Sequence, residues 1–186
     1  MYTELTNIRV AFQPNAWADE EFCESDIIRV ASDIVDAGVS GEIMVGMDNH
    51  SAQRTPRMME LYASLGMLPI FTAPNCTDCI SPVDHHIGRF IQNSMGKSYR
   101  DAVEQNPDIW MSATEDLDDP NCRSAEARRK LMAQWLSKAW DNLTSEFSHL
   151  IEAAFVKTGF KLALDGSDDY KMEIQGWSSQ APYSFR

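Results

Sequence analysis

Apolar residues recur along the chain at two spacings, and each spacing predicts a different kind of element. Residues 8–12 alternate apolar and polar side chains, as a short strand does, and 42–47 and 67–73 are apolar runs typical of buried strands. Residues 22–35 and 54–65 carry apolar side chains every three to four positions, which predicts two amphipathic helices. Strands that alternate with helices favour an α/β fold with a largely parallel sheet.

Local signals set the ends of these two helices. Asp19 precedes two glutamates and is predicted to cap the first helix, which we expect to stop at Gly38. Pro56 lies in the first turn of the second helix, and Gly66 follows its last apolar residue. The capping signals therefore agree with the hydrophobic spacing.

The second half of the chain is predicted to be mainly helical. Helices are expected over 84–105, 125–143 and 144–158. Apolar and polar residues alternate weakly over 160–174, around Asp165-Gly166, a pair typical of hairpin turns. We therefore expect a hairpin in this segment.

The 186 residues are enough for one domain with its own core. We expect an α/β core over 1–112, a helical C-terminal extension of the same domain over 113–176, and a disordered tail over 177–186.

The net charge of −12 comes from 28 acidic and 16 basic residues. It opposes tight binding of nucleic acid, because that affinity comes from Lys and Arg displacing counterions from phosphates. It leaves metal-dependent chemistry open, since a bound cation would supply positive charge at the phosphate. No signal peptide and no apolar run of about 18–20 residues is found, so we expect an intracellular protein without a membrane segment.

Four cysteines are too few for a disulfide scaffold in a chain of this length. Cys76 and Cys79 form a CxxC, which is half of a zinc site or a redox pair in other proteins. No second CxxC follows, and the residues between the two thiols are predicted to form a loop. Packed free thiols are therefore favoured, with a small zinc or redox module as the alternative.

Two aspartates follow predicted strands. Asp48 comes directly after 42–47, and Asp84 follows 67–73 and a proline-bounded loop. Ligands collect at the carboxyl ends of strands in α/β sheets, and Mg²⁺ prefers carboxylate oxygens. The simpler interpretations are a turn residue for Asp48 and a helix N-cap for Asp84.

The two aspartates lie in runs that resemble a known family. MVGMDNHSAQRT (44–55) and PIFTAPNCTDCISPVDHHIGRFIQ (69–92) are similar to the paired aspartate blocks of DDE-superfamily endonucleases. These are the RNase H-like catalytic domains of pogo- and mariner-type transposases and their domesticated relatives. Weaker matches extend the resemblance from about residue 8 to 176, at 15–19, 135–140 and 154–159.

The resemblance implies a partial RNase H-like fold over 1–112, with a central, mostly parallel sheet flanked by helices. It implies DNA as the partner, and Mg²⁺- or Mn²⁺-dependent cleavage and strand transfer in intact members. Asp48 would be the second and Asp84 the third catalytic acid, and both would hold metal. Asn49 and His50 would neighbour the site. His50 would contact metal-bound water or phosphate, or be a simple loop residue.

In this family the first acid lies on a strand that would precede residues 8–12, and residues 1–12 contain no aspartate. We therefore expect an N-terminally truncated, inactive domain that binds DNA weakly in the nucleus, or a gene-model fragment. The alternative is a non-catalytic domesticated scaffold or protein-interaction domain, with a protein partner or as an oligomer. Residues 131–140, rich in Trp and Leu, would then be a partner surface or simply core.

Several basic residues flank the proposed site and would line a nucleic-acid path, or form solvated helix faces. They are Arg54, Arg57, Arg89, Lys97 and Arg100, with a second group at Arg128, Arg129 and Lys130.

Overall fold

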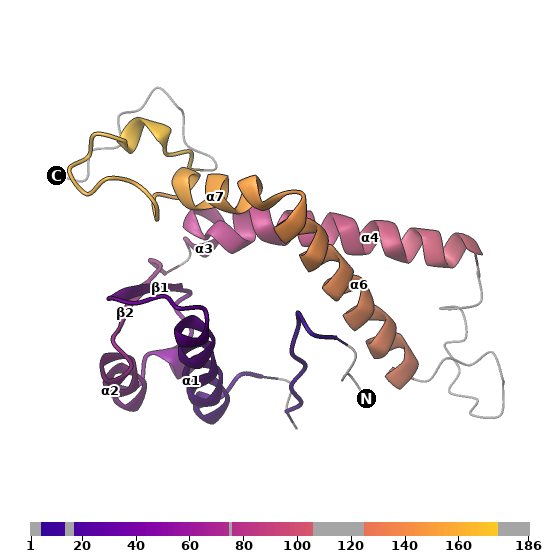
Figure 1. Ribbon diagram of the computed structural model, residues 1–186, viewed down its shortest axis with the longest axis horizontal. Coiled ribbons are helices and arrows are strands. Elements are labelled where there is room, and N and C mark those ends of the chain that lie inside the picture. The colour runs from indigo at the N-terminus through magenta and orange to yellow at the C-terminus, as the bar shows by residue number, and fades with distance from the viewer. Residues whose placement is uncertain (1–4, 14–16, 75, 106–124, 175–186) are drawn as a thin grey trace. The chain divides into compact units, whose positions relative to one another are not determined.

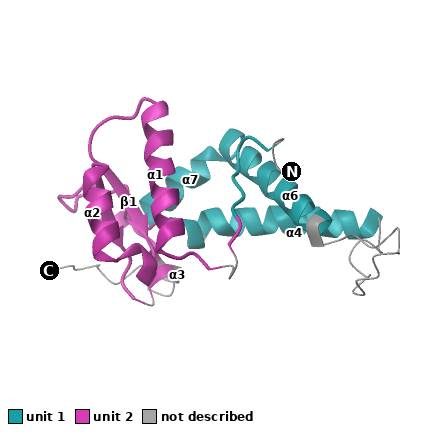
Figure 2. Cartoon of the chain, turned by 90° about the horizontal axis from the view of Figure 1, so that it is seen from below, with its two compact units in different colours: residues 1–11, 82–157 teal, residues 12–81, 158–186 magenta. Residues whose placement is uncertain are grey.

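The computed structural model describes residues 5–13, 17–74, 76–105 and 125–174. The chain divides into two compact units whose segments interleave along the sequence (Figure 2). Unit 1 comprises Met1–Ala11 and Pro82–Lys157, and unit 2 comprises Phe12–Ser81 and Thr158–Arg186. The described part is mostly helical with a two-stranded parallel sheet, so the mixed α/β class is confirmed. The predicted boundary at 112–113 and the predicted disordered tail, 177–186, lie outside the described residues.

The sheet of unit 2 is a parallel pair of strands joined through a helix. In β1 (Ile43–Met47) and β2 (Met67–Phe71), Ile43 lies opposite Met67 and Met47 opposite Phe71. The connection runs through a 3₁₀ turn, η1 (Ser51–Gln53), and α2 (Pro56–Ser64). Two of the three predicted strands and their parallel direction are therefore confirmed.

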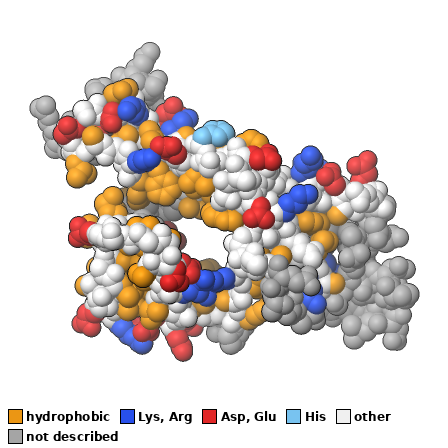
Figure 3. All heavy atoms as spheres, viewed as in Figure 1, with side chains coloured by type: hydrophobic (Ala, Val, Ile, Leu, Met, Phe, Trp, Pro, Cys, Tyr) orange, Lys and Arg blue, Asp and Glu red, His pale blue; other side chains and the backbone are white. Residues whose placement is uncertain are grey.

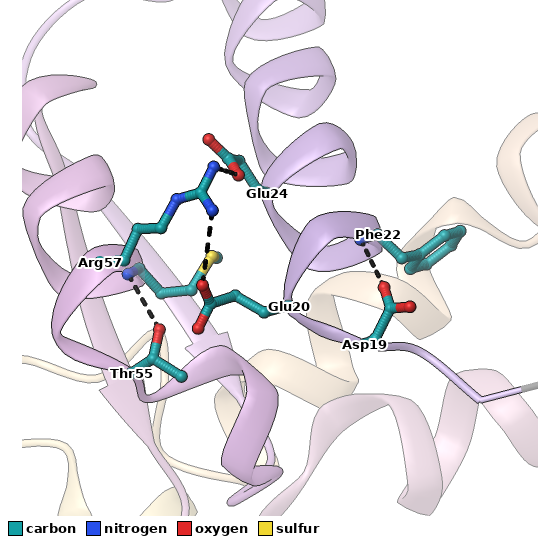
Figure 4. Close-up of polar contacts among 7 residues, drawn as sticks. Asp19, Glu20, Phe22, Glu24, Thr55 and Arg57 are labelled. Atoms are coloured by element: carbon teal, nitrogen blue, oxygen red, sulfur yellow. Dashed lines mark hydrogen bonds and ion pairs between the residues drawn. The ribbon is translucent and has the colours of Figure 1, made fainter.

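The helices of unit 2 begin and end where their capping residues predict. The Asp19 carboxylate accepts a hydrogen bond of 2.9 Å from the amide of Phe22 at the start of α1 (Glu20–Asp36; Figure 4). Thr55 caps α2 in the same way. Gly38 and Gly66, which follow the two helices, have φ of 72° and 68°, a conformation that disfavours other residues.

The core of unit 2 lies between the sheet and α1 and α2, which cover the same face of the sheet (Figure 1). The buried residues of this cluster are Cys23, Ile27, Met58, Tyr62 and Met67. The hydroxyl of Tyr62 donates to the backbone oxygen of Gln53 at 3.4 Å, so its polar end is satisfied.

The opposite face of the sheet is also apolar. Met44, Leu68 and Ile70 on this face are 53%, 45% and 36% exposed. The ring of Phe160, from the last segment of unit 2, packs over Gly46: a Cβ built at Gly46 would lie 2.4 Å from its Cε1 atom. Glycine at this position therefore admits the aromatic ring onto the strand.

The substitution Gly46→Ala is expected to destabilise unit 2 by about 1–3 kcal/mol, because the added methyl group overlaps the Phe160 ring. A double-mutant cycle with Phe160→Ala, followed by chemical denaturation, measures the coupling between the two positions. The cost of Gly46→Ala should largely disappear when Phe160 is alanine. Equal costs in both backgrounds would show that the ring does not pack on β1.

Unit 1 is a helical assembly. A π-helical turn, η2 (Val83–Ile87), continues directly into α4 (Gly88–Gln105). In the same unit, α6 (Ala125–Ser145) packs against α4, and α7 (Ser148–Lys157) packs against η2 (Figure 1). Ile87, Leu143 and Ala154 form the buried cluster. The predicted helices are confirmed, except that α6 extends through residues 144–145 and α7 begins later than predicted.

Three predictions about local structure are wrong. Residues 8–12 form no strand, because alternation gives a strand only when a neighbouring strand supplies hydrogen bonds. This segment is held instead by Asn7, whose side chain donates to the Ser137 backbone oxygen at 2.8 Å and to Asp141 Oδ1 at 2.6 Å. The predicted hairpin at 165–166 is a turn that leads into a 3₁₀ turn, η3 (Asp169–Lys171).

The third wrong prediction is the loop between Cys76 and Cys79. The chain forms one helical turn there, α3 (Thr77–Ile80), closed by a 3.0 Å bond from the Ile80 amide to the Cys76 oxygen. Pro74 and Pro82 flank this segment and prevent a longer helix, but a single helical turn fits between them. None of the described helices is both long and apolar enough to cross a membrane.

Candidate metal and nucleic-acid site

Asp48 lies directly after β1, at the carboxyl end of the sheet of unit 2. Its Oδ1 atom accepts a hydrogen bond of 3.3 Å from the amide of His50, which closes a small turn. The side chain is exposed. Since a carboxylate has about four acceptor sites, this single contact leaves Asp48 able to bind a cation or a donor group.

Asn49 and Arg54 come together next to Asp48. The Arg54 guanidinium donates to Oδ1 of Asn49 and lies 5.6 Å from the ring centroid of Phe71, the last residue of β2. The turn that follows one strand is thereby linked to the end of the other strand. This cluster of Asp48, Asn49, Arg54 and Phe71 is called the strand-end cluster below.

Sequence reasoning assigned no role to Phe71, Thr72 or Gln53, which also lie at this edge. Thr72 is buried, and its Oγ1 atom lies 3.3 Å from Oγ1 of Thr77. The side-chain oxygen of Gln53 is buried and has no hydrogen-bond partner among the described residues. Thr72 could have been found from the sequence, because it is a polar residue at the end of an apolar run. Phe71 and Gln53 could not, because their positions depend on the pairing of the strands.

Asp84 lies in unit 1, in the π-helical turn η2. The N-cap position is Pro82, so Asp84 occupies the first turn rather than the cap itself. Its side chain is exposed. Gly88 is needed here, because a Cβ at this position would lie 2.8 Å from the Val83 oxygen. Single π-helical turns are rare and are frequently found at functional sites, which keeps Asp84 a candidate site residue.

Each of the two predicted acids is described within its own unit, Asp48 in unit 2 and Asp84 in unit 1. Their joint binding of one cation therefore stays a prediction. Among the described residues, no group of three His, Cys, Asp or Glu side chains is placed to hold a metal ion. Asp48 fits Mg²⁺ as one hard oxygen ligand, because its carboxylate is exposed and contacts only its own turn.

The buried Cys23 thiol is held in its protonated form. Burial raises the pKa of the Cys23 thiol, and the nearby carboxylates of Asp26, Asp19 and Asp48 raise it further. This thiol therefore stays protonated and is a poor nucleophile. Cys76 is a half-buried free thiol. The side chain of Cys79 lies outside the described residues, so the zinc or redox alternative stays a prediction.

The two arginines that flank α2 differ in their partners. Arg57 pairs with Glu24 and, at 3.7 Å, with Glu20 (Figure 4), and Glu24 is the main cause of its raised pKa. Within the described part of the chain, Arg54 forms no ion pair, and its guanidinium donates to Asn49 and lies over the ring of Phe71. On the face shown in Figure 3, Lys and Arg side chains are scattered in small groups among acidic ones.

The Trp- and Leu-rich face of α6 takes part in packing within unit 1. Trp135 meets Tyr99 of α4 edge to face, with ring centroids 6.4 Å apart. Ala139 and Leu143 of the same helix are fully buried, whereas Trp140 is 38% exposed. Part of this helix therefore packs in the core, and a partner surface that includes Trp140 stays a prediction.

Comparison of the chain with protein-family profiles, with curated proteins and with solved structures finds no match. The site itself is therefore the basis for a functional proposal.

Proposed function

We propose that this chain is a nucleic-acid-binding domain of the DDE transposase type, with an RNase H-like core. In this proposal Asp48 and Asp84 hold Mg²⁺ or Mn²⁺ against a phosphate of DNA in the nucleus. The observation that carries the proposal is the position of Asp48, an exposed carboxylate at the carboxyl end of a parallel strand. Strand ends of this kind are where α/β proteins bind their ligands.

The charges of the site agree with this proposal. Two carboxylates would repel a phosphodiester, and a bound divalent cation neutralises both kinds of anion. Asn49 and His50 extend the turn after Asp48, and the His50 amide fixes one carboxylate oxygen. Asp84 is supported by its exposure and by its place in a π-helical turn.

The proposal also accounts for the acidic balance of the chain. With a net charge of −12, binding of DNA through Lys and Arg alone should be weak and sensitive to salt. Affinity should therefore depend on the metal ion. This dependence separates the proposed site from a general electrostatic surface.

Supercoiled plasmid incubated with the chain and Mg²⁺ or Mn²⁺ is expected to remain uncut. Only two of the three acids of the DDE family have a counterpart here by resemblance, and in-line attack on a phosphodiester needs two well-placed metal ions. Conversion of plasmid to the nicked form, read on agarose gels, is the measurement. Nicking by the wild type that disappears in both Asp48→Ala and Asp84→Ala would contradict the expectation and show a complete catalytic site.

A second candidate function is a non-catalytic scaffold or protein-interaction domain. The observation in its favour is the exposed apolar face of the sheet, formed by Met44, Leu68 and Ile70. Such a domain would use this face and would have no need of Asp48. Metal-dependent binding of DNA that requires Asp48 therefore distinguishes the two functions.

A further inference from the structure

We propose that Arg54 is the phosphate-binding residue of the strand-end cluster, and that its guanidinium contacts a DNA phosphodiester beside Asp48. This inference rests on the proposed DNA-binding function and assigns the residue that contacts the backbone of the nucleic acid. The planar guanidinium has five N–H donors in a fixed fork, which matches the oxygens of a phosphate.

The first argument is that the Arg54 guanidinium is held in place by groups other than a carboxylate. Its side-chain contacts are the amide oxygen of Asn49 and the ring of Phe71. Both partners are uncharged, so they orient the guanidinium without forming an ion pair with it. Among the described residues, Arg54 has no carboxylate within ion-pair distance and no second hydrogen-bond acceptor.

The second argument comes from Arg57, three residues away. Its guanidinium is already occupied by Glu20 and Glu24 of α1, and it ties α1 to α2 (Figure 4). Arg57 therefore has a structural explanation that Arg54 lacks. An exposed arginine that is fixed by neutral groups is suited to an anion supplied from outside the chain.

The third argument is the position of Arg54 at the edge where Asp48 lies. The Asn49 side chain that holds Arg54 belongs to the residue directly after Asp48, and Phe71 is the last residue of the neighbouring strand. A carboxylate that binds a cation and an arginine that binds an anion then lie at one edge. This combination suits a metal-bound phosphodiester, which carries both charges.

The test is a titration of a fluorescein-labelled DNA duplex with the full chain in Mg²⁺, read by fluorescence anisotropy at several salt concentrations. Arg54→Gln is compared with Arg57→Gln, which removes the same charge three residues away. Arg54→Gln is expected to weaken binding about tenfold at low salt and to reduce the slope of log K against log salt by about 0.9, the value for one phosphate contact. Arg57→Gln should change the affinity by less than about twofold.

Arg54→Lys serves as a third variant that keeps the charge and the aliphatic stem. It is expected to bind DNA with an affinity between those of wild type and Arg54→Gln, because it lacks the planar fork. Thermal unfolding of each variant verifies that the fold is retained. Equal affinities and equal salt slopes for Arg54→Gln and Arg57→Gln would overturn this inference and leave the proposed function standing. Absence of DNA binding by the wild type would overturn both.

Discussion

Met58→Ala is expected to lower the free energy of unfolding by about 2–5 kcal/mol, whereas Met59→Ala should lower it by less than about 1 kcal/mol. The two methionines are adjacent in α2 and chemically identical. Met58 is 0% exposed and Met59 is 42% exposed. The pair therefore separates the effect of burial from the small gain in helix propensity that both alanine substitutions share.

The large effect at Met58 follows from its place in the core of unit 2. Its side chain packs with Cys23 and Ile27 of α1, Tyr62 of α2 and Met67 of β2. Truncation to alanine removes apolar contacts to both helices and the sheet and leaves a cavity that this close-packed cluster fills only in part. Urea denaturation followed by circular dichroism measures both variants. Similar losses at Met58 and Met59 would show that α2 does not pack in the described orientation.

The parts of the fold that the sequence predicted are those set by local chemistry. Asp19 and Gly38 bound α1 because a cap satisfies free amides and a glycine tolerates positive φ, whatever the rest of the chain does. β1 and β2 could be paired in parallel from the sequence, because the helix of 54–65 between them requires a crossover connection.

The parts that failed depend on partners that are distant in the sequence. Residues 8–12 alternate apolar and polar side chains but pair with no strand of the described part of the chain, and the preceding residue, Asn7, bonds to α6 instead. The helical turn after Cys76 forms over four residues, too few for hydrophobic periodicity to reveal it.

The candidate site was likewise predicted only in part. Asp48 and Asp84 stood out because each follows an apolar strand, whereas Asn49 was named through the family resemblance alone. The contacts of Arg54 with Asn49 and Phe71 were not predictable, since they follow from the register that places Met47 opposite Phe71. The RNase H-like fold, and the roles of the two aspartates within it, stay predictions from resemblance.

Mg²⁺ is expected to tighten binding of DNA by the wild-type chain roughly tenfold, equivalent to about 1.4 kcal/mol. Asp48→Asn and Asp84→Asn should each abolish this gain, because each removes a carboxylate that would hold the cation. Without metal the same substitutions should strengthen binding slightly, since they remove a negative charge that repels phosphate. The effect of each substitution on DNA affinity thus changes sign when metal is added. The loss of one negative charge, without a bound metal, would strengthen binding under both conditions.

Glu60→Gln supplies the matched control. Glu60 lies in α2, is exposed, and takes no part in the strand-end cluster. Its substitution removes the same charge as Asp48→Asn. Glu60→Gln should leave the gain in affinity from Mg²⁺ unchanged. If the gain depended only on net charge, all three variants would lose it equally. If it depends on the site, only the two aspartate variants lose it.

The most direct test of the proposed site is therefore the ratio of the DNA dissociation constant without Mg²⁺ to that with Mg²⁺, measured by fluorescence anisotropy for wild type, Asp48→Asn, Asp84→Asn and Glu60→Gln. We predict a ratio of roughly ten for wild type and Glu60→Gln and of about one for the two aspartate variants. The same ratio in all four proteins would contradict the assignment of Asp48 and Asp84 as metal ligands at a phosphodiester.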